Sequence, residues 1–156
     1  MTLRQYRPAD LNSVWTLHLH AIDGSGGEAS DDYFADLRRI EAEFLSHGGE
    51  FVVGESDRQI VAMGGLKRTT IDTAQITRMR VHPSFQRHGF GTLVLRHLEK
   101  RAVELGYRVL HLDTTVAQTQ AQRFYLRNGY RRVGTGTKQE FNVIYFEKQI
   151  VSDSNT

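Results

Sequence analysis

Two bases and two glycines occupy the junction between a strand-like segment and a helix-like segment. The stretch reads Pro-Ser-Phe-Gln-Arg-His-Gly-Phe-Gly and covers residues 83–91. The first turn of a helix leaves its N–H groups without intrahelical partners, and aligned peptide dipoles make that end positive. A glycine has no Cβ that could keep an anion away from these N–H groups. The pattern therefore predicts a phosphate or pyrophosphate cradle formed by the backbone of residues 86–91, with Arg87 and His88 adding positive potential.

The glycines have three alternative interpretations. A simple turn of the backbone is the first. The G-x-G-x-x-G motif would need a glycine at position 94, which is Val94, and a P-loop would need a Gly-Lys pair, which the chain lacks. A second Gly-x-Gly, Gly134-Thr135-Gly136, is followed by no helix-like segment, so we expect it to form a bulge or a turn between two strands.

Residues 81–91, Val-His-Pro-Ser-Phe-Gln-Arg-His-Gly-Phe-Gly, resemble the acetyl-coenzyme A signature of the GNAT superfamily of N-acetyltransferases, V-x-P-x-x-[Q/R]-x-x-G-x-[G/A]. Residues 121–130, Ala-Gln-Arg-Phe-Tyr-Leu-Arg-Asn-Gly-Tyr, are similar to the family's A-x-x-F-Y-x-x-x-G-[F/Y] helix. The two motifs stand in the family's order, about 30 residues apart. The resemblance implies the acyl-CoA N-acyltransferase fold, with a mixed, mostly antiparallel central sheet of about seven strands flanked by about four helices.

The resemblance also implies acetyl-CoA as the co-substrate and direct transfer of its acetyl group to an amine. Backbone groups of Met79 and Val81 would then bind the pantetheine arm and the acetyl carbonyl, with the N–H of Val81 as the oxyanion donor. Gln118 stands where the family often has an asparagine, and it would hydrogen-bond the pantetheine. The residues that would receive the pyrophosphate are Gln86, Arg87, His88, Gly89, Phe90, Gly91 and Thr92.

In the family pattern Tyr125 is the candidate general acid, because its hydroxyl can protonate or hydrogen-bond the leaving thiolate; packing at the edge of the core is the alternative role. Many members place a glutamate base six residues before the signature valine. This chain has Gln75 there, which cannot accept a proton at neutral pH. The amine proton would then pass through water to another carboxylate or to His111 or Asp113, which share strand parity and point to one face of the sheet.

Acceptor choice in this family usually depends on the first two helices, the loop between them and the last strands. Glu28, Asp31 and Asp32 in that loop would suit a cationic amine such as a polyamine, an amino-sugar drug or a lysine-like side chain. Helix capping and dipole matching are the alternative roles for Asp31 and Asp32. The expected acceptor is a primary amine of a small molecule or peptide. A module that senses acyl-CoA with little catalysis is the alternative function, which Gln75 favours.

The rest of the sequence predicts the elements that must position these residues. Apolar spacing and turn signals predict strands at residues 3–7, 51–55, 60–69, 74–81, 108–114, 130–133 and 141–148. They predict helices at about residues 11–22, 31–45, 89–105 and 118–128. The order indicates a mixed α/β sheet with helices on both faces. In the third helix we expect the inward residues to be Leu93, Val94, Leu98, Ala102 and Leu105.

Composition limits the class of protein. With 156 residues, 39% hydrophobic and 24% charged, the chain is expected to form one domain over residues 1–151 with a loose polar tail at 152–156. No apolar run approaches the roughly 20 residues that a membrane span needs, and the N-terminus lacks the apolar core of a signal peptide. We therefore expect a cytoplasmic protein without a membrane partner.

Charge and metal-binding residues exclude other classes. The net charge of +2 is too small to demand a nucleic-acid partner. The absence of cysteine excludes disulfides, a thiolate nucleophile and cysteine metal sites, and the seven histidines form no His-Glu-x-x-His pattern. We expect no metal. Family members are often dimers, and no patch in the sequence decides whether this chain forms a homodimer.

Overall fold

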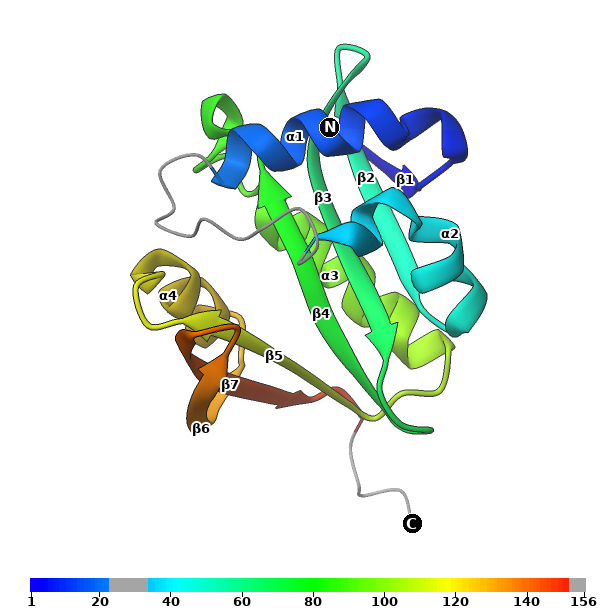
Figure 1. Cartoon of the computed structure of the whole chain (residues 1–156). Helices are drawn as coiled ribbons and strands as arrows, with labels where there is room; N and C mark the ends of the chain where they lie inside the picture. Colours follow the sequence, from blue (N-terminus) through cyan, green and yellow to red (C-terminus); the bar gives the residue numbers. More distant parts are fainter. Residues whose placement is uncertain (23–33, 152–156) are drawn as a thin grey trace.

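The computed structural model describes residues 1–22 and 34–151 (Figure 1). Seven strands form one mixed sheet in the order β1-β2-β3-β4-β5-β7-β6, which confirms the expected fold class. The elements, with η for a 3-10 helix, are β1 (Thr2–Gln5), η1 (Pro8–Asp10), α1 (Leu11–Ile22), η2 (Ala35–Arg38), α2 (Ile40–Glu43), η3 (Leu45–His47), β2 (Glu50–Ser56), β3 (Gln59–Arg68), β4 (Thr73–Val81), η4 (Pro83–Phe85), α3 (Phe90–Glu104), β5 (Val109–Thr115), α4 (Thr119–Arg127), β6 (Arg131–Lys138) and β7 (Phe141–Gln149).

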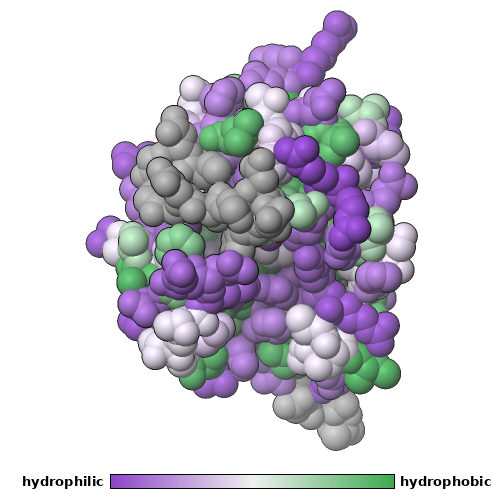
Figure 2. Space-filling view, in the orientation of Figure 1, coloured by the Kyte–Doolittle hydropathy of each residue, from purple (hydrophilic) through white to green (hydrophobic). Residues whose placement is uncertain are grey.

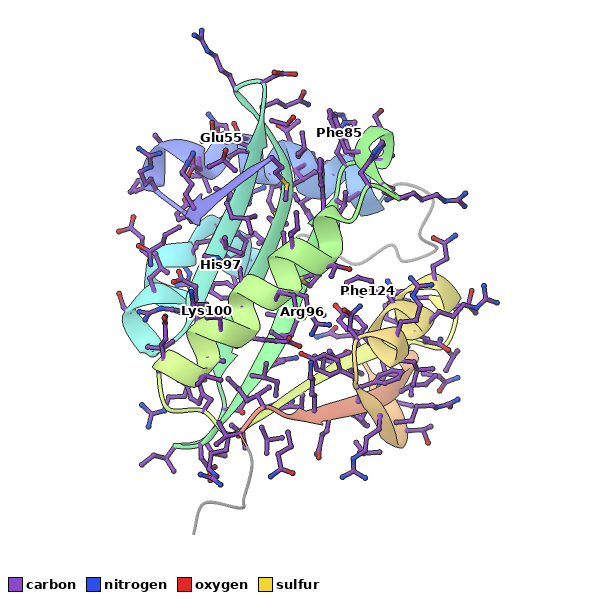
Figure 3. The ribbon with its side chains drawn as sticks, turned by 180° about the vertical axis from the view of Figure 1, so that it is seen from behind. Glu55, Phe85, Arg96, His97, Lys100 and Phe124 are labelled. Atoms are coloured by element: carbon purple, nitrogen blue, oxygen red, sulfur yellow. The ribbon has the colours of Figure 1, made fainter. Side chains whose placement is uncertain are left out.

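The sheet has one parallel junction, between β4 and β5, and every other neighbouring pair of strands is antiparallel. Parallel strands need a crossover, and α3 supplies it. In Figure 1, α1 and α2 cover the near face of β1–β4, while α3 crosses behind these strands. Figure 3, seen from behind, shows that α3 and α4 lie on the same face of the sheet. The second half of the sheet, β5, β7 and β6, branches away from β4 (Figure 1).

Burial in α3 follows the expected periodicity with two errors, at Leu93 and at Leu95, which is fully buried although it was not expected to face inward. In α3 the residues Val94, Leu95, Leu98 and Ala102 are buried against the sheet. Leu93 was expected to face inward, but 48% of it is exposed. In a helix with 3.6 residues per turn, positions 94, 95, 98 and 102 lie on one side, and position 93 lies on the opposite side.

The predicted helix at 31–45 is not continuous. Its first residues lie outside the described part of the chain, and from Ala35 onward the segment consists of η2, α2 and η3. The break falls at Arg39, whose φ of −138° and ψ of 46° are not helical. Leu37, Ile40 and Phe44 are nevertheless fully buried, so the apolar spacing was read correctly although the helix was not.

Gly134 and Gly136 lie inside β6, so the alternative of a turn between two strands is wrong. The register of β6 on β7 does shift between Arg132 and Gly134, as in a bulge. A Cβ at Gly136 would come within 2.9 Å of the ring of Tyr145 on the paired strand. A larger residue at position 136 would have to displace the exposed ring of Tyr145.

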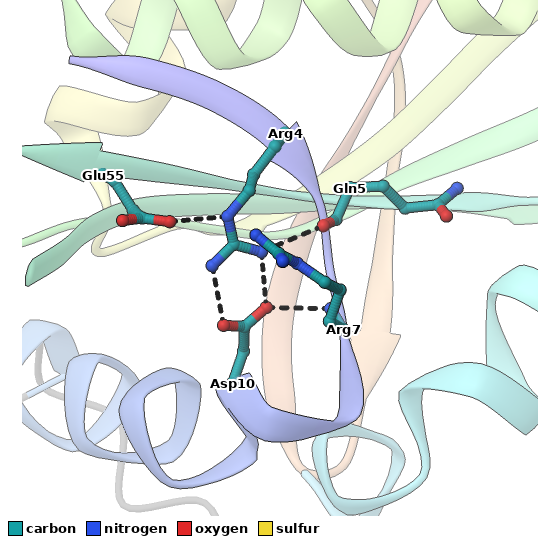
Figure 4. A network of polar contacts seen from close by, with 5 residues as sticks. All are labelled: Arg4, Gln5, Arg7, Asp10 and Glu55. Atoms are coloured by element: carbon teal, nitrogen blue, oxygen red, sulfur yellow. Dashed lines mark hydrogen bonds and ion pairs between the residues drawn. The ribbon is translucent and has the colours of Figure 1, made fainter. Parts of the chain in front are cut away.

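A network of ion pairs ties β1 to the start of α1 (Figure 4). Arg4 donates to both carboxylate oxygens of Asp10 at 2.8 Å and to Glu55 at 2.5 Å. Asp10 also accepts the N–H of Arg7 at 2.8 Å. The hydrogen bond from Arg4 holds the pKa of Asp10 below its ordinary value, although burial opposes this shift.

One face of the molecule is mainly polar. On the face seen in Figure 2, hydrophilic residues predominate and hydrophobic ones form small separate groups. Within residues 1–22 and 34–151, none of the helices combines the length and the apolar character that crossing a membrane requires.

Candidate active site

The candidate site lies where β4 and β5 separate. These strands pair at three positions only, ending with Gln75 opposite His111. Beyond that point they diverge, and a cavity of about 530 Å³ opens between them. This volume falls within the range of small-molecule sites, about 300 to 1,000 Å³. The walls come from β4, β5, α4, β6 and β7, with Ala21 of α1 and Phe34 at one side.

A bulge in β4 shapes one wall of the cavity. Arg80 pairs with Met63 and Thr77 pairs with Gly65, so Arg78 and Met79 together lie opposite Gly64. Arg78 has a φ of 58°, a left-handed conformation that is uncommon for a residue with a side chain. A Cβ at Gly64 would come within 2.6 Å of the sulfur of Met79. The glycine therefore leaves the space that the bulge needs.

Backbone groups of Val81 point to the open side of β4. The N–H of His82 donates to the carbonyl oxygen of Val61 at 2.8 Å. Since Val81 lies opposite Ala62, this bond makes them a non-hydrogen-bonded pair of the antiparallel ladder. The N–H and C=O of Val81 consequently point away from β3, toward the cavity. The amide of Gln86 donates to that carbonyl oxygen at 3.2 Å, and the N–H of Val81 faces the divergence of the strands.

The predicted cradle lies beside the cavity at the start of α3. Gly89 is the N-cap, with a φ of 80° that favours glycine, and nothing lies within 4 Å of where its Cβ would be. Leu93 donates its N–H to the carbonyl of Gly89 at 3.1 Å, so the N–H groups of residues 90–92 have no carbonyl within the helix to bind. Arg87 and His88 are exposed. Of the loop residues 86–92, Gln86 also lines the cavity.

Tyr125 lies on α4 and lines the cavity together with Gln118. Its ring is buried against Phe124, Tyr130 and Phe146, with ring centroids 5.1, 5.6 and 6.5 Å away. Burial raises the pKa of Tyr125 above its ordinary value, although Arg80 acts in the opposite direction. The phenol therefore keeps its proton at neutral pH.

The side chain of Gln118 is engaged by the backbone. Its carbonyl oxygen accepts the N–H of Thr115 at 2.9 Å, which joins the end of β5 to the start of α4. Gln118 therefore lies at the cavity as predicted, and its amide group is held there by β5.

The two candidate proton acceptors occupy different places although they share a sheet face. Asp113 lines the cavity and forms an ion pair with Lys138 at 3.2 Å. His111 is not among the residues that line the cavity. Its Nε2 lies 2.8 Å from the hydroxyl of Thr69, and burial lowers its pKa. Gln75, which stands at the family's glutamate position, lines the cavity.

A cationic wall lies on the side of the cavity next to η2. The sequence did not lead us to predict it. The guanidinium groups of Arg78 and Arg80 lie 4.7 and 5.8 Å from the ring centroid of Phe34, and all three residues line the cavity. Asp36 pairs with Arg78 at 3.1 Å and with Lys67 at 2.6 Å. Burial alone would raise the pKa of Asp36, but Arg78 and Lys67 lower it below its ordinary value.

The Arg78-Met79-Arg80 sequence shows two bases of one parity, but regular alternation would put them on the face of the buried Ala74 and Ile76, and the bulge turns them to the face of Phe34. The predicted acceptor residues Glu28, Asp31 and Asp32 lie outside the described residues. In the described part of the chain, no group of three or more His, Asp or Glu side chains is arranged to hold a metal ion.

The described residues fit a bound acetyl-CoA at two places. The start of α3 offers N–H groups and an open Gly89 to a pyrophosphate. The cavity brings Met79, Val81, Gln118 and Tyr125 together around the space where an acyl-pantetheine would lie. The two places meet at Gly91, where a Cβ would be 3.4 Å from the ring of Phe124 and 3.7 Å from Val81.

Known proteins give the following comparisons. Residues 12–130 match the model of the acetyltransferase (GNAT) family. No curated protein matches the sequence. A solved acetyltransferase of the GNAT family from Staphylococcus aureus Mu50 is 21% identical, with a TM-score of 0.89 over 96% of this chain and 99% of that chain.

Two other solved structures contain the coenzyme. The protein yncA of Salmonella typhimurium, solved with its cofactor acetyl-CoA, is 19% identical, with a TM-score of 0.81 over 100% of this chain and 97% of that chain. An aminoglycoside 6'-N-acetyltransferase complexed with coenzyme A is 15% identical, with a TM-score of 0.79 over 99% of this chain and 100% of that chain. Likeness at these identities shows a shared fold, and the expected acyl-CoA N-acyltransferase fold is confirmed.

Proposed function

This chain belongs to the acetyltransferase (GNAT) family, and from that membership we propose that it moves an acetyl group from acetyl-CoA to the primary amine of a small molecule or peptide by direct transfer. The observation that carries the proposal is the cavity between the diverging strands, because it brings Val81 and Tyr125 together. The two relatives solved with coenzyme A or acetyl-CoA support the choice of donor.

In the proposed reaction acetyl-CoA supplies the acyl group: a C–N bond forms to the amine while the C–S bond breaks. The first turn of α3 binds the pyrophosphate and so orients the thioester. The N–H of Val81, a fixed dipole, donates to the carbonyl oxygen as charge develops on it. Tyr125, which its raised pKa keeps protonated, donates a hydrogen bond or its proton to the departing sulfur, and a donated proton returns to the phenol from water.

The amine must lose a proton, and Gln75 cannot take it. Asp113 is the better placed of the two candidates, since it lines the cavity and His111 does not. We assign the proton to Asp113 through one or more waters, with Lys138 as the counter-ion 3.2 Å away. Replacing Gln75 with Glu would place a carboxylate in the same cavity, and we expect Gln75→Glu to raise turnover.

Two sets of charged residues, one in the described wall of the cavity and one predicted from the sequence, divide the possible acceptors into two classes. Arg78 and Arg80 in its described wall favour an amine that also carries an anionic group, such as an amino acid or an acidic peptide. Glu28, Asp31 and Asp32 favour a cationic amine. A panel that contains both classes therefore decides which set of charges governs binding.

A second candidate function is an acyl-CoA sensor with little catalysis. Two observations favour it: Gln75 is no base, and the carboxylate of Asp113 is already paired with Lys138. Such a module would bind acetyl-CoA and release no thiol.

Calorimetry and a thiol-release assay test both candidates. We expect acetyl-CoA to bind and adenosine to bind far more weakly; failure of acetyl-CoA to bind would refute both. Thiol release is then measured with spermidine, kanamycin, glutamate and a peptide that begins with alanine. Release above the rate without amine supports the transferase, whereas binding without release from any amine supports the sensor. The protein is expected to act in the cytoplasm, without metal or nucleic acid, and its oligomeric state is read from the same preparation by light scattering.

A further inference from the structure

A buried carboxylate on α3 lies outside the candidate site and has partners on α3, on β7 and in the turn between α4 and β6. Glu99 is 8% exposed, and its Oε2 accepts from the Tyr130 hydroxyl at 2.8 Å and from Lys148 Nζ at 3.0 Å. Its Oε1 accepts from Arg96 at 2.9 Å. Lys148 also donates to the carbonyl oxygen of Asn128 at 2.9 Å. We name Glu99, Tyr130, Lys148 and Asn128 the Glu99 cluster.

The cluster joins the two halves of the sheet. Between the strands, the halves share the three residue pairs of β4 with β5. The helix α3 packs on β2, β3 and β4, so Glu99 belongs to the first half. Asn128 is the C-cap of α4, Tyr130 lies between α4 and β6, and Lys148 lies on β7, so the partners of Glu99 belong to the second half. Figure 3 shows Arg96 of α3 and Phe124 of α4 on the facing sides of these two helices.

The cluster is also connected to Tyr125. The Tyr130 ring meets the Tyr125 ring edge to face at 5.6 Å, and the Tyr130 N–H donates to the Tyr125 carbonyl at 3.0 Å. Burial and the carboxylate of Glu99 raise the pKa of Tyr130, so its hydroxyl remains a donor. The shared apolar core also spans α3 and α4, but apolar contacts are non-directional, whereas charged hydrogen bonds fix a register.

We propose that the Glu99 cluster is a positioning device, which holds α4 against α3 and thereby sets the place of Tyr125 relative to the coenzyme cradle at the start of α3. The inference rests on the proposed function. None of the four cluster residues lines the cavity, so the cluster acts on the reaction through Tyr125 and not by touching the substrate.

The test compares Glu99→Gln with a matched control, Glu50→Gln. Glu50 is also a buried carboxylate, 4% exposed, and it accepts from Gln5, from the N–H of Phe51 and from Arg101 of α3. Its partners all lie in the first half of the sheet or on α3, so it supports the fold without contacting α4. Tyr130→Phe removes one hydroxyl from the cluster and keeps the ring against Tyr125.

Three measurements separate positioning from general stability. For Glu99→Gln we expect turnover, measured with saturating acetyl-CoA and the best amine of the panel, to fall on the order of tenfold. The calorimetric Kd for acetyl-CoA should change by less than about threefold, because the cradle on α3 is intact. Amide hydrogen exchange should accelerate in residues 119–130 and not in β2 and β3. Tyr130→Phe should show the same pattern to a smaller degree, and Glu50→Gln should accelerate exchange in β2 with turnover unchanged.

The proposal is overturned if Glu99→Gln turns over and exchanges like the wild type, or if Glu50→Gln loses as much turnover as Glu99→Gln. The exchange measurement needs no amine, so it decides the question even where the panel yields no turnover. Failure of the wild type to bind acetyl-CoA would instead refute the proposed function, and calorimetry on the wild type distinguishes the two failures.

Discussion

Removal of a single oxygen atom at position 125 separates chemistry from packing. The ring of Tyr125 is held by Phe124, Tyr130 and Phe146, and Tyr125→Phe keeps all three contacts. We therefore expect the free energy of unfolding to change by less than about 1 kcal/mol. The Kd for acetyl-CoA should also change little, because the cradle lies on α3.

Turnover should respond much more strongly. General acid catalysis contributes about 10²- to 10⁴-fold, which corresponds to a barrier about 2.7 to 5.4 kcal/mol higher without the hydroxyl. The raised pKa of Tyr125 gives a second expectation, because the phenol stays protonated. The alkaline side of the pH–rate profile should have the same shape in the wild type and in Tyr125→Phe.

The assay is thiol release at saturating acetyl-CoA, over a range of pH, with calorimetry for the coenzyme and thermal unfolding for stability. Tyr145→Phe is the control, since Tyr145 lies on β7, is 36% exposed and is not among the residues that line the cavity. Equal turnover of Tyr125→Phe and wild type would refute the role of general acid and leave Tyr125 as a packing residue. A large loss of stability would refute the claim that the ring contacts suffice.

Three further predictions concern the cradle, acid stability and a buried hydroxyl. Gly89→Val forces a branched residue into a φ of 80°, which should lower the free energy of unfolding by about 1 to 2 kcal/mol and should weaken acetyl-CoA binding measured by calorimetry. The control is Gly106→Val, beyond the other end of α3, where φ is 96° and the space is equally open. It should lower stability by a similar amount and leave the Kd for acetyl-CoA unchanged. Asp10→Asn should lower the free energy of unfolding at pH 7 by about 1 to 3 kcal/mol. Since the folded-state pKa of Asp10 is lowered, its contribution to stability is present above the ordinary value of 3.8 and is lost as the pH falls through the folded pKa. The stabilities of variant and wild type in urea titrations should therefore converge in acid, and a constant difference would contradict the ion-pair account. Thr114 has a buried hydroxyl with no hydrogen-bond partner among the described residues, so Thr114→Val should be neutral or stabilising by up to about 1 kcal/mol in thermal unfolding. The control, Thr73→Val, should destabilise the protein. It loses hydroxyl contacts of 2.7 Å to Thr70 and 2.8 Å to Thr69.

The parts of the fold that follow from local periodicity were predictable from the sequence. The strands and α3 were placed within a residue or two for most of the chain, because alternation and a 3.6-residue stripe report which side chains are buried. The segment after Ala35 was not, since Leu37, Ile40 and Phe44 satisfy the same spacing whether the backbone is one helix or three short pieces. Tertiary packing decided the backbone there, and sequence spacing does not record it.

The candidate site divides in the same way. Gly89 and Gln86 could be identified from their types and positions, because the chemistry of a helix start depends on local backbone. The bulge at Arg78 could not, since it depends on Gly64 of the neighbouring strand. Strand parity correctly put His111 and Asp113 on one face, but parity does not report where β5 leaves β4, and that point determines which of the two reaches the cavity.

The short junction of β4 with β5 has a consequence for the stability of the native state. Since β4 and β5 share three residue pairs, cohesion between the halves of the sheet rests mainly on the shared apolar core and the Glu99 cluster, and local opening of the native state between the halves requires the loss of these contacts. A donor bound between Val81 and α4 would bridge both halves and add RT ln(1 + [L]/Kd) to stability, about 2.7 kcal/mol at 100 times the Kd. The melting temperature should therefore rise with acetyl-CoA concentration. Without that ligand the two halves would separate more often, which faster amide hydrogen exchange along β5 would report.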